Sequence, residues 1–452
     1  MKKLLLLAAT FFAFQFAFAQ YENFDLSKYK LPEMKRHQLD FYFDSNGDFQ
    51  HVYILNDNEF LKDTSRSRDN TVSGKANLLY TFYKNSTKIQ SSSNVLFSSS
   101  YGLSERKATG SDGYDNGTFK IDFSGRYDLN YFLNDANWFV RGVPAVQFSY
   151  TDHTQDNYDR KYLSTAESFT FGIGKGRIEQ VQDFRHAVLI LEELNKRGLT
   201  KKNLNENELY ELAALISQLK NERFFDSRRK MESDLTAVDS LLKTQGVVDV
   251  SDVRYFNGLL DMWRYGDLQP RESGNRISLN ITPGYSYADL DFNSEPNDVD
   301  RIEEDFRMIY DVSFSSFNPL SIKWQADYNI GVQHIYTNEL QNLFNFPQKH
   351  YLSATYVAGA LGFYPNTRTF LRLSSSFNLL NQSFNEDKIF DKDRYSFRCR
   401  FSLNAYYYIS ERLRVEGLLT LNNDYAGIFN SKWGHAETNR LLYNLTLNYA
   451  IF

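Results

Sequence analysis

The chain has 452 residues, a net charge of −5 and charged residues of mixed sign, which argues against the strongly basic surface of a nucleic-acid-binding protein. Its 31 Tyr and 38 Phe are many for a mean hydropathy of −0.51, yet beyond the N-terminus no apolar run reaches the about 18 residues of a membrane-spanning helix. With Cys399 as the only cysteine, an intrachain disulfide framework is excluded.

The N-terminus carries the pattern of an export signal. Two lysines precede an apolar run that ends in the A-x-A motif of residues 17–19, so we expect a signal peptide over residues 1–19 that is removed before Gln20. The alternative is a short membrane anchor, which the small-residue motif and the polar sequence after it disfavour. No cysteine directly follows the cleavage site, so a lipid anchor is not expected. Residues 20–36 are interpreted as an N-terminal periplasmic segment.

Most of the remaining chain alternates between apolar and polar residues, the period of a strand with one polar face. In residues 395–409, Phe397 and Phe401 share one face, whereas Arg398 and Arg400 share the other. A turn at residues 45–48 within the first run is an open alternative. Fourteen runs are counted, six before a helical stretch and eight after it, near residues 37–56, 73–84, 89–104, 118–133, 138–153, 164–175, 275–292, 302–317, 321–338, 350–365, 369–385, 394–409, 413–429 and 437–452.

The runs favour a membrane barrel over a secreted β-sandwich or propeller, whose strands also alternate. Each run has about ten residues or more, enough for a tilted strand to cross the hydrocarbon. Short turns and long loops alternate, as at the periplasmic and extracellular ends of a barrel. We therefore predict a mainly β fold, a transmembrane antiparallel β-barrel of about 14 strands with an inserted all-α segment. The long polar loops are expected at residues 106–117, 154–162, 294–300, 340–349 and 386–393.

The period changes between residues 178 and 270, which we interpret as a helical insertion between barrel strands 37–177 and 271–452. Asn205 and Glu208 have the spacing of a capping box. Each apolar stripe is narrow on a charged helix, so the helices must pack on one another or on the barrel. The four expected stripes are Val181, Phe184, Val188 and Leu191; Leu209, Leu212, Ile216 and Leu219; Met231, Leu235, Val238 and Leu242; and Val253, Phe256, Leu260 and Trp263.

The strand count places the insertion on one side of the membrane. The C-terminus of such barrels is periplasmic, and the eight strands between it and the insertion return the chain to the same side. The insertion is therefore expected in the periplasm, in place of a short turn. Gly172, Gly174 and Gly176 precede it on the expected lumen face. Small residues at the barrel rim explain them better than a phosphate loop, because no Lys-Ser/Thr pair follows.

The polar face of the predicted strands carries charges of both signs. Two interpretations stay open. Either the charged side chains pair with one another and fill the barrel, or they form a charged constriction that selects solutes. A barrel of this size falls between filled eight-stranded barrels and open porins. The candidate lumen-lining residues are Lys120, Asp122, Arg126, Asp128, Arg141, Asp305, Arg307, Asp311, Lys323, Asp327, Arg372, Arg398, Arg400, Arg414 and Glu416.

No enzyme, cofactor or metal site is predicted. The histidines lie mostly in or near expected loops, no motif flanks a nucleophilic serine, and no H-x-x-H or C-x-x-C spacing indicates a metal. An outer-membrane lipid hydrolase, whose triad only the fold would assemble, is the remote alternative.

The signal peptide ending before Gln20, the alternating strands rich in Phe, Tyr and Asn, and the terminal Phe452 resemble porin-like outer-membrane β-barrel proteins of Bacteroidota-type bacteria. The resemblance covers the mature chain in style and includes no diagnostic motif. It implies residence in outer-membrane lipid and insertion by the barrel-assembly machinery, which commonly reads a terminal aromatic residue. Phe452 departs from this pattern, because the apolar face of the last strand runs through the odd-numbered residues from Leu441 to Ile451.

Two functions are compatible with this organisation. In the first, the barrel is a channel or uptake protein for small polar solutes, and the insertion gates or lines its periplasmic mouth. In the second, the barrel is a non-transporting anchor, and residues 178–270 bind a periplasmic or envelope-assembly partner. The charged lumen face favours the first, and the size of the insertion favours the second. A nucleic-acid partner is not expected.

Overall fold

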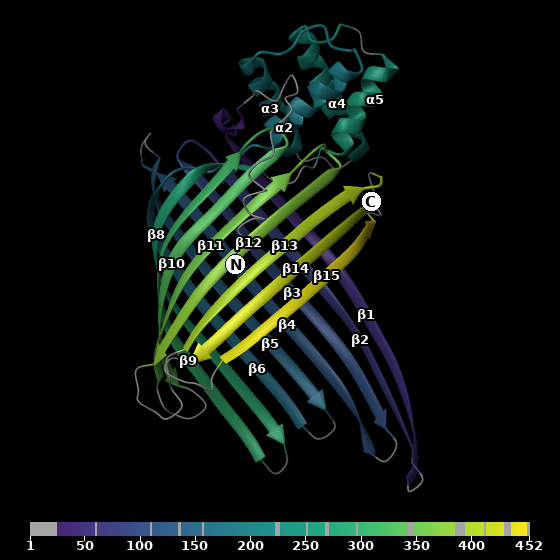
Figure 1. The fold of residues 1–452 in the computed structure, drawn as a ribbon, viewed down its shortest axis with the longest axis vertical. Coiled ribbons are helices and arrows are strands. Elements are labelled where there is room, and N and C mark those ends of the chain that lie inside the picture. The colour runs from purple at the N-terminus through teal and green to yellow at the C-terminus, as the bar shows by residue number, and fades with distance from the viewer. Residues whose placement is uncertain are drawn as a thin grey trace.

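The fold is mainly β, as the sequence predicts (Figure 1). Within the residues described, fourteen long strands form one antiparallel sheet, and the two-residue strand β7 (Glu179–Gln180) pairs beside it with β8. The computed structural model describes residues 25–58, 61–108, 111–133, 137–155, 158–221, 227–249, 252–266, 271–294, 297–341, 348–384, 394–410, 413–428 and 435–449.

Six long strands precede the helices and eight follow them, in agreement with the predicted count. A turn at residues 45–48 is wrong, because β1 continues through them, with Ser45 opposite Gly74 and Asp48 opposite Thr71. The strands are β1 (Met34–Asn58), β2 (Leu61–Asn85), β3 (Ile89–Ala108), β4 (Ser111–Phe132), β5 (Trp138–Gln155), β6 (Tyr158–Lys175), β8 (Glu272–Ser294), β9 (Asn297–Pro319), β10 (Trp324–Gln341), β11 (Gln348–Phe363), β12 (Thr369–Phe384), β13 (Arg394–Tyr408), β14 (Leu413–Ile428) and β15 (His435–Tyr449).

Three of the five predicted long loops are wrong. Residues 106–117, 154–162 and 294–300 are mostly strand, and the hairpins β3–β4, β5–β6 and β8–β9 continue almost to their tips. Their polarity is compatible with strands, because a hairpin that extends beyond the hydrocarbon pairs through its backbone and needs no apolar face. Most of residues 340–349 and 386–393, and the terminal Phe452, lie outside the described residues.

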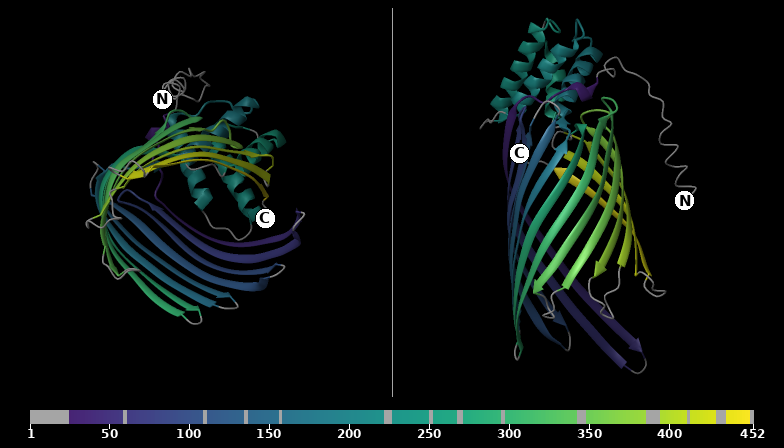
Figure 2. Two further views of the ribbon diagram at one scale, coloured as in Figure 1. Left: turned by 60° about the horizontal axis from the view of Figure 1, so that its bottom comes forward. Right: turned by 90° about the vertical axis from the view of Figure 1, so that its left-hand side faces the viewer.

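The sheet curves into a barrel wall in which each strand pairs with its neighbour in the sequence (Figure 2, left). β6 pairs directly with β8, so the helical insertion leaves the order of the wall intact. In the part of the chain that the structure describes, β1 and β15 end this order without pairing with each other.

The wall has an apolar outer face and a polar inner face. Opposed residues on neighbouring strands share a face, and the row Phe314, Ile330 and Val357 is exposed on the outside. Similar large apolar side chains are exposed on each of the fourteen long strands described. A belt of this kind is the surface that a barrel presents to hydrocarbon. The chain is thus a transmembrane antiparallel β-barrel with an inserted all-α segment.

The helices lie at one end of the barrel (Figures 1 and 2) and share one apolar core with the N-terminal segment. Leu26 of the short 3-10 helix η1 (Leu26–Lys28) and Tyr29 are buried in this core, where the Tyr29 and Phe184 rings lie 5.4 Å apart between centroids. The expected N-terminal segment is therefore part of the helical unit. The α-helices are α2 (Gln182–Lys196), α3 (Glu206–Asn221), α4 (Ser227–Thr244) and α5 (Val253–Arg264).

Local signals decide where these helices begin. The capping box is confirmed, since the Asn205 and Glu208 side chains each accept the other's backbone N–H, at 2.9 and 3.0 Å. The predicted stripe of α5 is displaced by one residue, about 100° around the helix, because Tyr255 and Leu259 are buried whereas Val253 is 76% exposed, although Trp263 packs on the core as predicted. α5 carries apolar residues on overlapping faces, and packing against α2 selects one of them.

Of the helices described, none is long and apolar enough to cross a membrane.

Candidate functional site: the barrel interior and its helical end

Four of the predicted lumen residues, Arg126, Asp128, Arg141 and Asp311, meet around Asn280 on the inner wall. Arg126 pairs with Asp128 at 3.8 Å, and Arg141 on β5 forms a second ion pair with the same carboxylate. Arg141 also donates to Asn280 Oδ1 at 3.4 Å. The Asn280 amide in turn donates to Asp311 at 3.0 Å. The contacts link β4, β5, β8 and β9 in a chain along the wall.

Arg372 and Asp327 form a second cluster, on the inner face of β10 and β12. The guanidinium lies 2.9 Å from the carboxylate, which also accepts a hydrogen bond from Gln325 at 2.8 Å. Asp327 is largely buried behind these partners. As in the first cluster, the contact joins strands two apart in the sheet.

Most of the other candidates also pair with close neighbours. Lys120 and Asp122 pair within β4 at 3.0 Å, Arg414 and Glu416 pair within β14 at 2.5 Å, Arg398 pairs with Asp424 at 2.7 Å, and Arg400 donates to Asn422 at 2.9 Å. Asp305 accepts from Ser286 at 3.1 Å, and Arg307 lines a cavity on the inner face.

Lys323 lies outside the strands, unlike the other candidates. It was predicted on the polar face of a strand, but β10 begins at Trp324, so Lys323 lies in the turn that precedes it. Its carbonyl accepts the Tyr364 N–H at 2.7 Å. The alternation of the sequence continues across the strand end and so does not reveal it.

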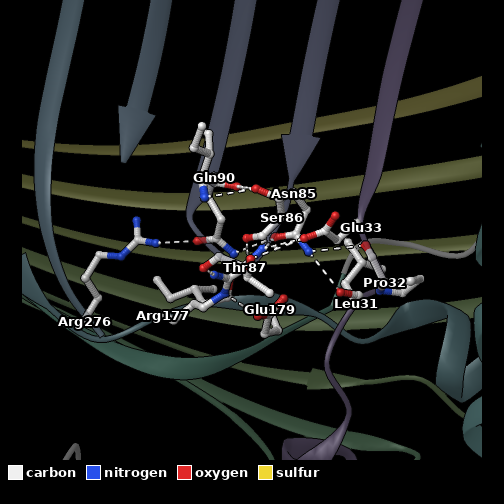
Figure 3. A network of polar contacts seen from close by, with 12 residues as sticks. Leu31, Pro32, Glu33, Asn85, Ser86, Thr87, Gln90, Arg177, Glu179 and Arg276 are labelled. Carbon is white, nitrogen blue, oxygen red and sulfur yellow. Dashed lines mark hydrogen bonds and ion pairs between the residues drawn. The ribbon is translucent and has the colours of Figure 1, made fainter. Parts of the chain in front are cut away.

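The hydrogen bonds that cross between distant strands lie at the helical end. Gln90 on β3 accepts from Arg276 on β8 at 3.1 Å, although β4, β5 and β6 lie between them in the sheet. Figure 3 shows that these side chains lie in a larger polar network. Arg177 donates to the Ser86 and Thr87 carbonyls of the β2–β3 turn, at 2.7 and 2.9 Å. We call this set the rim network; its members are Leu31, Pro32, Glu33, Asn85, Ser86, Thr87, Gln90, Arg177, Glu179 and Arg276.

The three glycines before the insertion allow the rim to close tightly. A Cβ at Gly174 would lie 2.4 Å from the Phe139 ring, and one at Gly172 would lie 2.3 Å from Asn280 Oδ1. Gly176 has a φ of +110°, which a residue with a side chain rarely adopts. Small residues at the rim are therefore required by close approach and backbone conformation.

Helix α2 is held on the barrel end by arginine contacts to turn carbonyls. Arg185 is fully buried and donates to the carbonyls of Ile322, Tyr364 and Asn366, at 3.1, 2.9 and 3.1 Å. These acceptors belong to the β9–β10 and β11–β12 turns. Charged donors make the stronger class of hydrogen bond, so Arg185 couples the insertion to two separate hairpins.

A second buried arginine follows the insertion. Arg271 donates to the carbonyls of Ser321, Ile322 and Trp324, at 2.5 to 2.9 Å. Burial lowers the pKa of Arg271 to about 9 and that of Arg185 to about 10. Both values lie above neutral pH, so both side chains carry their charge.

The sequence analysis missed these arginines. Residues 181 to 191 are buried on all sides of α2. Its apolar stripe packs on α3 and α5, Asp183 and His186 also contact those helices, and Arg185 faces the barrel. The polar positions look like an ordinary solvent-exposed face in the sequence. The carbonyls that accept from Arg185 are about 140 to 180 residues away, and those that accept from Arg271 are about 50 residues away, so no local pattern reveals either set.

No family model matches the chain, and no curated protein matches it in sequence. Among solved structures it is similar to the toluene transporter TodX of Pseudomonas putida (8% identity over 91% of this chain and 88% of that chain, TM-score 0.26). It is also similar to the translocator domain of the autotransporter NalP from Neisseria meningitidis (8% identity, 81% and 90%, TM-score 0.26). An outer membrane channel from Pseudomonas putida F1 is a third (10% identity, 96% and 100%, TM-score 0.25). TM-scores this low carry no argument about function, which has to be inferred from this chain's own residues.

Proposed function

We propose that the chain is an outer-membrane channel for small polar solutes whose periplasmic end is closed by the helical insertion. One observation carries the proposal. Among the described residues, the ion pairs of the inner wall join groups within a strand or on strands one or two places away, so these side chains extend along the wall and form no pair across the axis. An interior filled by its own network would instead contain ion pairs between opposite walls.

The closure at one end has its own support. Contacts between distant strands, the close-packed rim glycines and the buried arginines all lie at the end that carries the helices. The long hairpins β3–β4, β5–β6 and β8–β9 extend from the opposite end (Figure 1), as the longer extracellular segments of such barrels do. A structure fixed to two hairpins and to the rim is well placed to control entry.

Recording from the full-length protein in a planar lipid bilayer tests the channel. Arg400 lies on the inner wall, so Arg400→Ala should assemble normally and shift the reversal potential in a salt gradient towards cation selectivity. The matched control is Arg254→Ala, since Arg254 is exposed on α5. Absence of conductance from the wild-type protein, or an equal shift with both variants, contradicts the proposal.

The anchor function remains a second candidate because of α5. Val253 and Phe256 are exposed on its outer face, at 76% and 39%, and large exposed apolar side chains together mark interaction surfaces. If the insertion docks a periplasmic partner, Phe256→Ser should abolish cross-linking to that protein and leave conductance unchanged. A change in conductance with no loss of cross-linking would favour the channel alone.

A further inference from the structure

Two prolines interrupt the backbone ladder at the same height of the barrel wall. The pairing of β4 with β5 skips two positions around Pro144, and that of β6 with β8 skips two around Pro283, with the register unchanged on either side. Proline has no N–H to donate. The register places Tyr127, Pro144, Phe169 and Pro283 in one row across four neighbouring strands. We call these four residues the proline row.

The proline row lies on the outer face, within the apolar belt. Val140 and Val146 flank Pro144 on the same face of β5, and both are exposed. Pro283 has the same position on β8, between the exposed Ile281 and Tyr285. The wall is therefore weakened at a height that faces hydrocarbon, where a backbone group without a partner is costly.

Two cavities lie back to back at this height. The outer one, about 720 Å³, contains the whole proline row in its lining together with the aromatic rings of Phe123 and Phe306. The inner one, about 670 Å³, is lined by inward-facing residues that include Ser124, Gln147 and Arg307. A single sheet separates them.

Half of the residues that line both cavities are small. They are Gly125, Ala145, Ser168 and Gly284; the other four are Arg126, Val146, Glu167 and Tyr285. A Cβ at Gly125 would meet only ordinary contacts, the nearest being Val146 Cγ1 at 3.5 Å. On the inner face, hydroxyl groups of Thr170 and Thr282 lie 2.8 Å apart and span the interrupted ladder. A side-chain contact thus holds the wall where two backbone pairs are missing.

A carboxylate lies at the same place on the outer face. Glu167 is exposed between Val146 and Tyr285, and it lines both cavities. Charged residues on the lipid side of a barrel are destabilising unless they reach water, and those that occur within the membrane are commonly functional. Water that enters through the thin partition would hydrate Glu167.

From this convergence we propose that the wall around the proline row is a side portal, through which a small, largely apolar molecule passes between the barrel interior and the bilayer. The portal rests on the proposed channel in one respect, since the barrel interior must be a path for solutes. Aromatic and proline side chains dominate the outer lining and select for apolar molecules, whereas ions and sugars follow the polar wall along the axis.

The experiment measures uptake of the uncharged apolar dye N-phenyl-1-naphthylamine by intact cells that express the full-length chain. A Gly125→Cys variant in a Cys399→Ser background assembles first and is then labelled with benzyl maleimide, so the block does not depend on folding with a bulky residue. Gly117→Cys is the matched control, because Gly117 lies on the same strand and face and a Cβ there meets nothing within 4 Å. Labelling is verified by mass spectrometry.

Labelling at Gly125 should reduce dye uptake to that of cells without the protein, while labelling at Gly117 leaves it unchanged. Ion conductance in planar bilayers should be unchanged by either label. Equal dye uptake with both labels overturns the portal while leaving the channel in place. Absence of conductance from the unlabelled protein overturns the channel itself, so the two failures are distinguishable.

Discussion

Replacing Arg185 by methionine should loosen the insertion from the barrel end. Methionine keeps an apolar stem but removes the guanidinium that donates to the Ile322, Tyr364 and Asn366 carbonyls. The lost interaction is a buried hydrogen-bonded contact of a charged group, and such a contact contributes about 1.5–3 kcal/mol. Since each 1.4 kcal/mol is about a factor of ten, the equilibrium between closed and open ends should shift by about one to two orders of magnitude.

Single-channel recording measures this shift directly as the fraction of time that the channel is open. The control is Arg197→Met, because Arg197 forms a partly exposed pair with Glu193 on the same helix, at 2.7 Å. Pairs of this kind contribute about 0.3–0.5 kcal/mol, so its open fraction should hardly change. Circular dichroism shows whether the helices remain folded. An Arg185→Met protein with intact helices and a wild-type open fraction would refute the gating role of this contact.

Three further predictions follow from the same geometry. Tyr328→Arg places a cation in the outer apolar belt, costs about 2–4 kcal/mol near the midplane and should reduce heat-modifiable barrel in outer-membrane fractions; recovery at the wild-type level would reverse the assignment of faces. A Lys202→Cys variant, in a Cys399→Ser background, should react with a membrane-impermeant thiol reagent only after the outer membrane is permeabilised; labelling in intact cells would place the insertion outside. Burial and the neighbouring Lys220 and Arg185 hold the pKa of His186 well below its usual 6.5, so the unfolded insertion binds a proton below about pH 6.5 that the folded one does not. Stability should therefore fall from pH 7 to about pH 5.5, as measured by thermal unfolding, and less so in His186→Gln.

Strand positions were predictable because each barrel residue faces one of two different environments. Side chains on a strand point alternately to hydrocarbon and to the polar interior. Apolar and polar residues such as Tyr328 and Asn329 therefore alternate along the sequence, and this period of two predicts which face each side chain is on. Helix starts are local as well, as the reciprocal bonds of Asn205 and Glu208 show. The predicted loops at 106–117, 154–162 and 294–300 are wrong for a related reason. The sequence shows that these residues are polar, but it does not show whether polar residues beyond the membrane pair as strands.

The tertiary structure decided the features on which the proposed function and the side portal depend. The sequence shows that Arg185 is charged and lies on a helix. Only the fold places it against the carbonyls of two distant turns. Pro144 and Pro283 are 139 residues apart and interrupt the same height of the wall only because two ladders, β5–β6 and β6–β8, bring them into one row. Period and capping are properties of neighbouring residues and can be read from the chain. Register between strands and contacts across the barrel end depend on which distant segments meet, and packing of the whole sheet determines that.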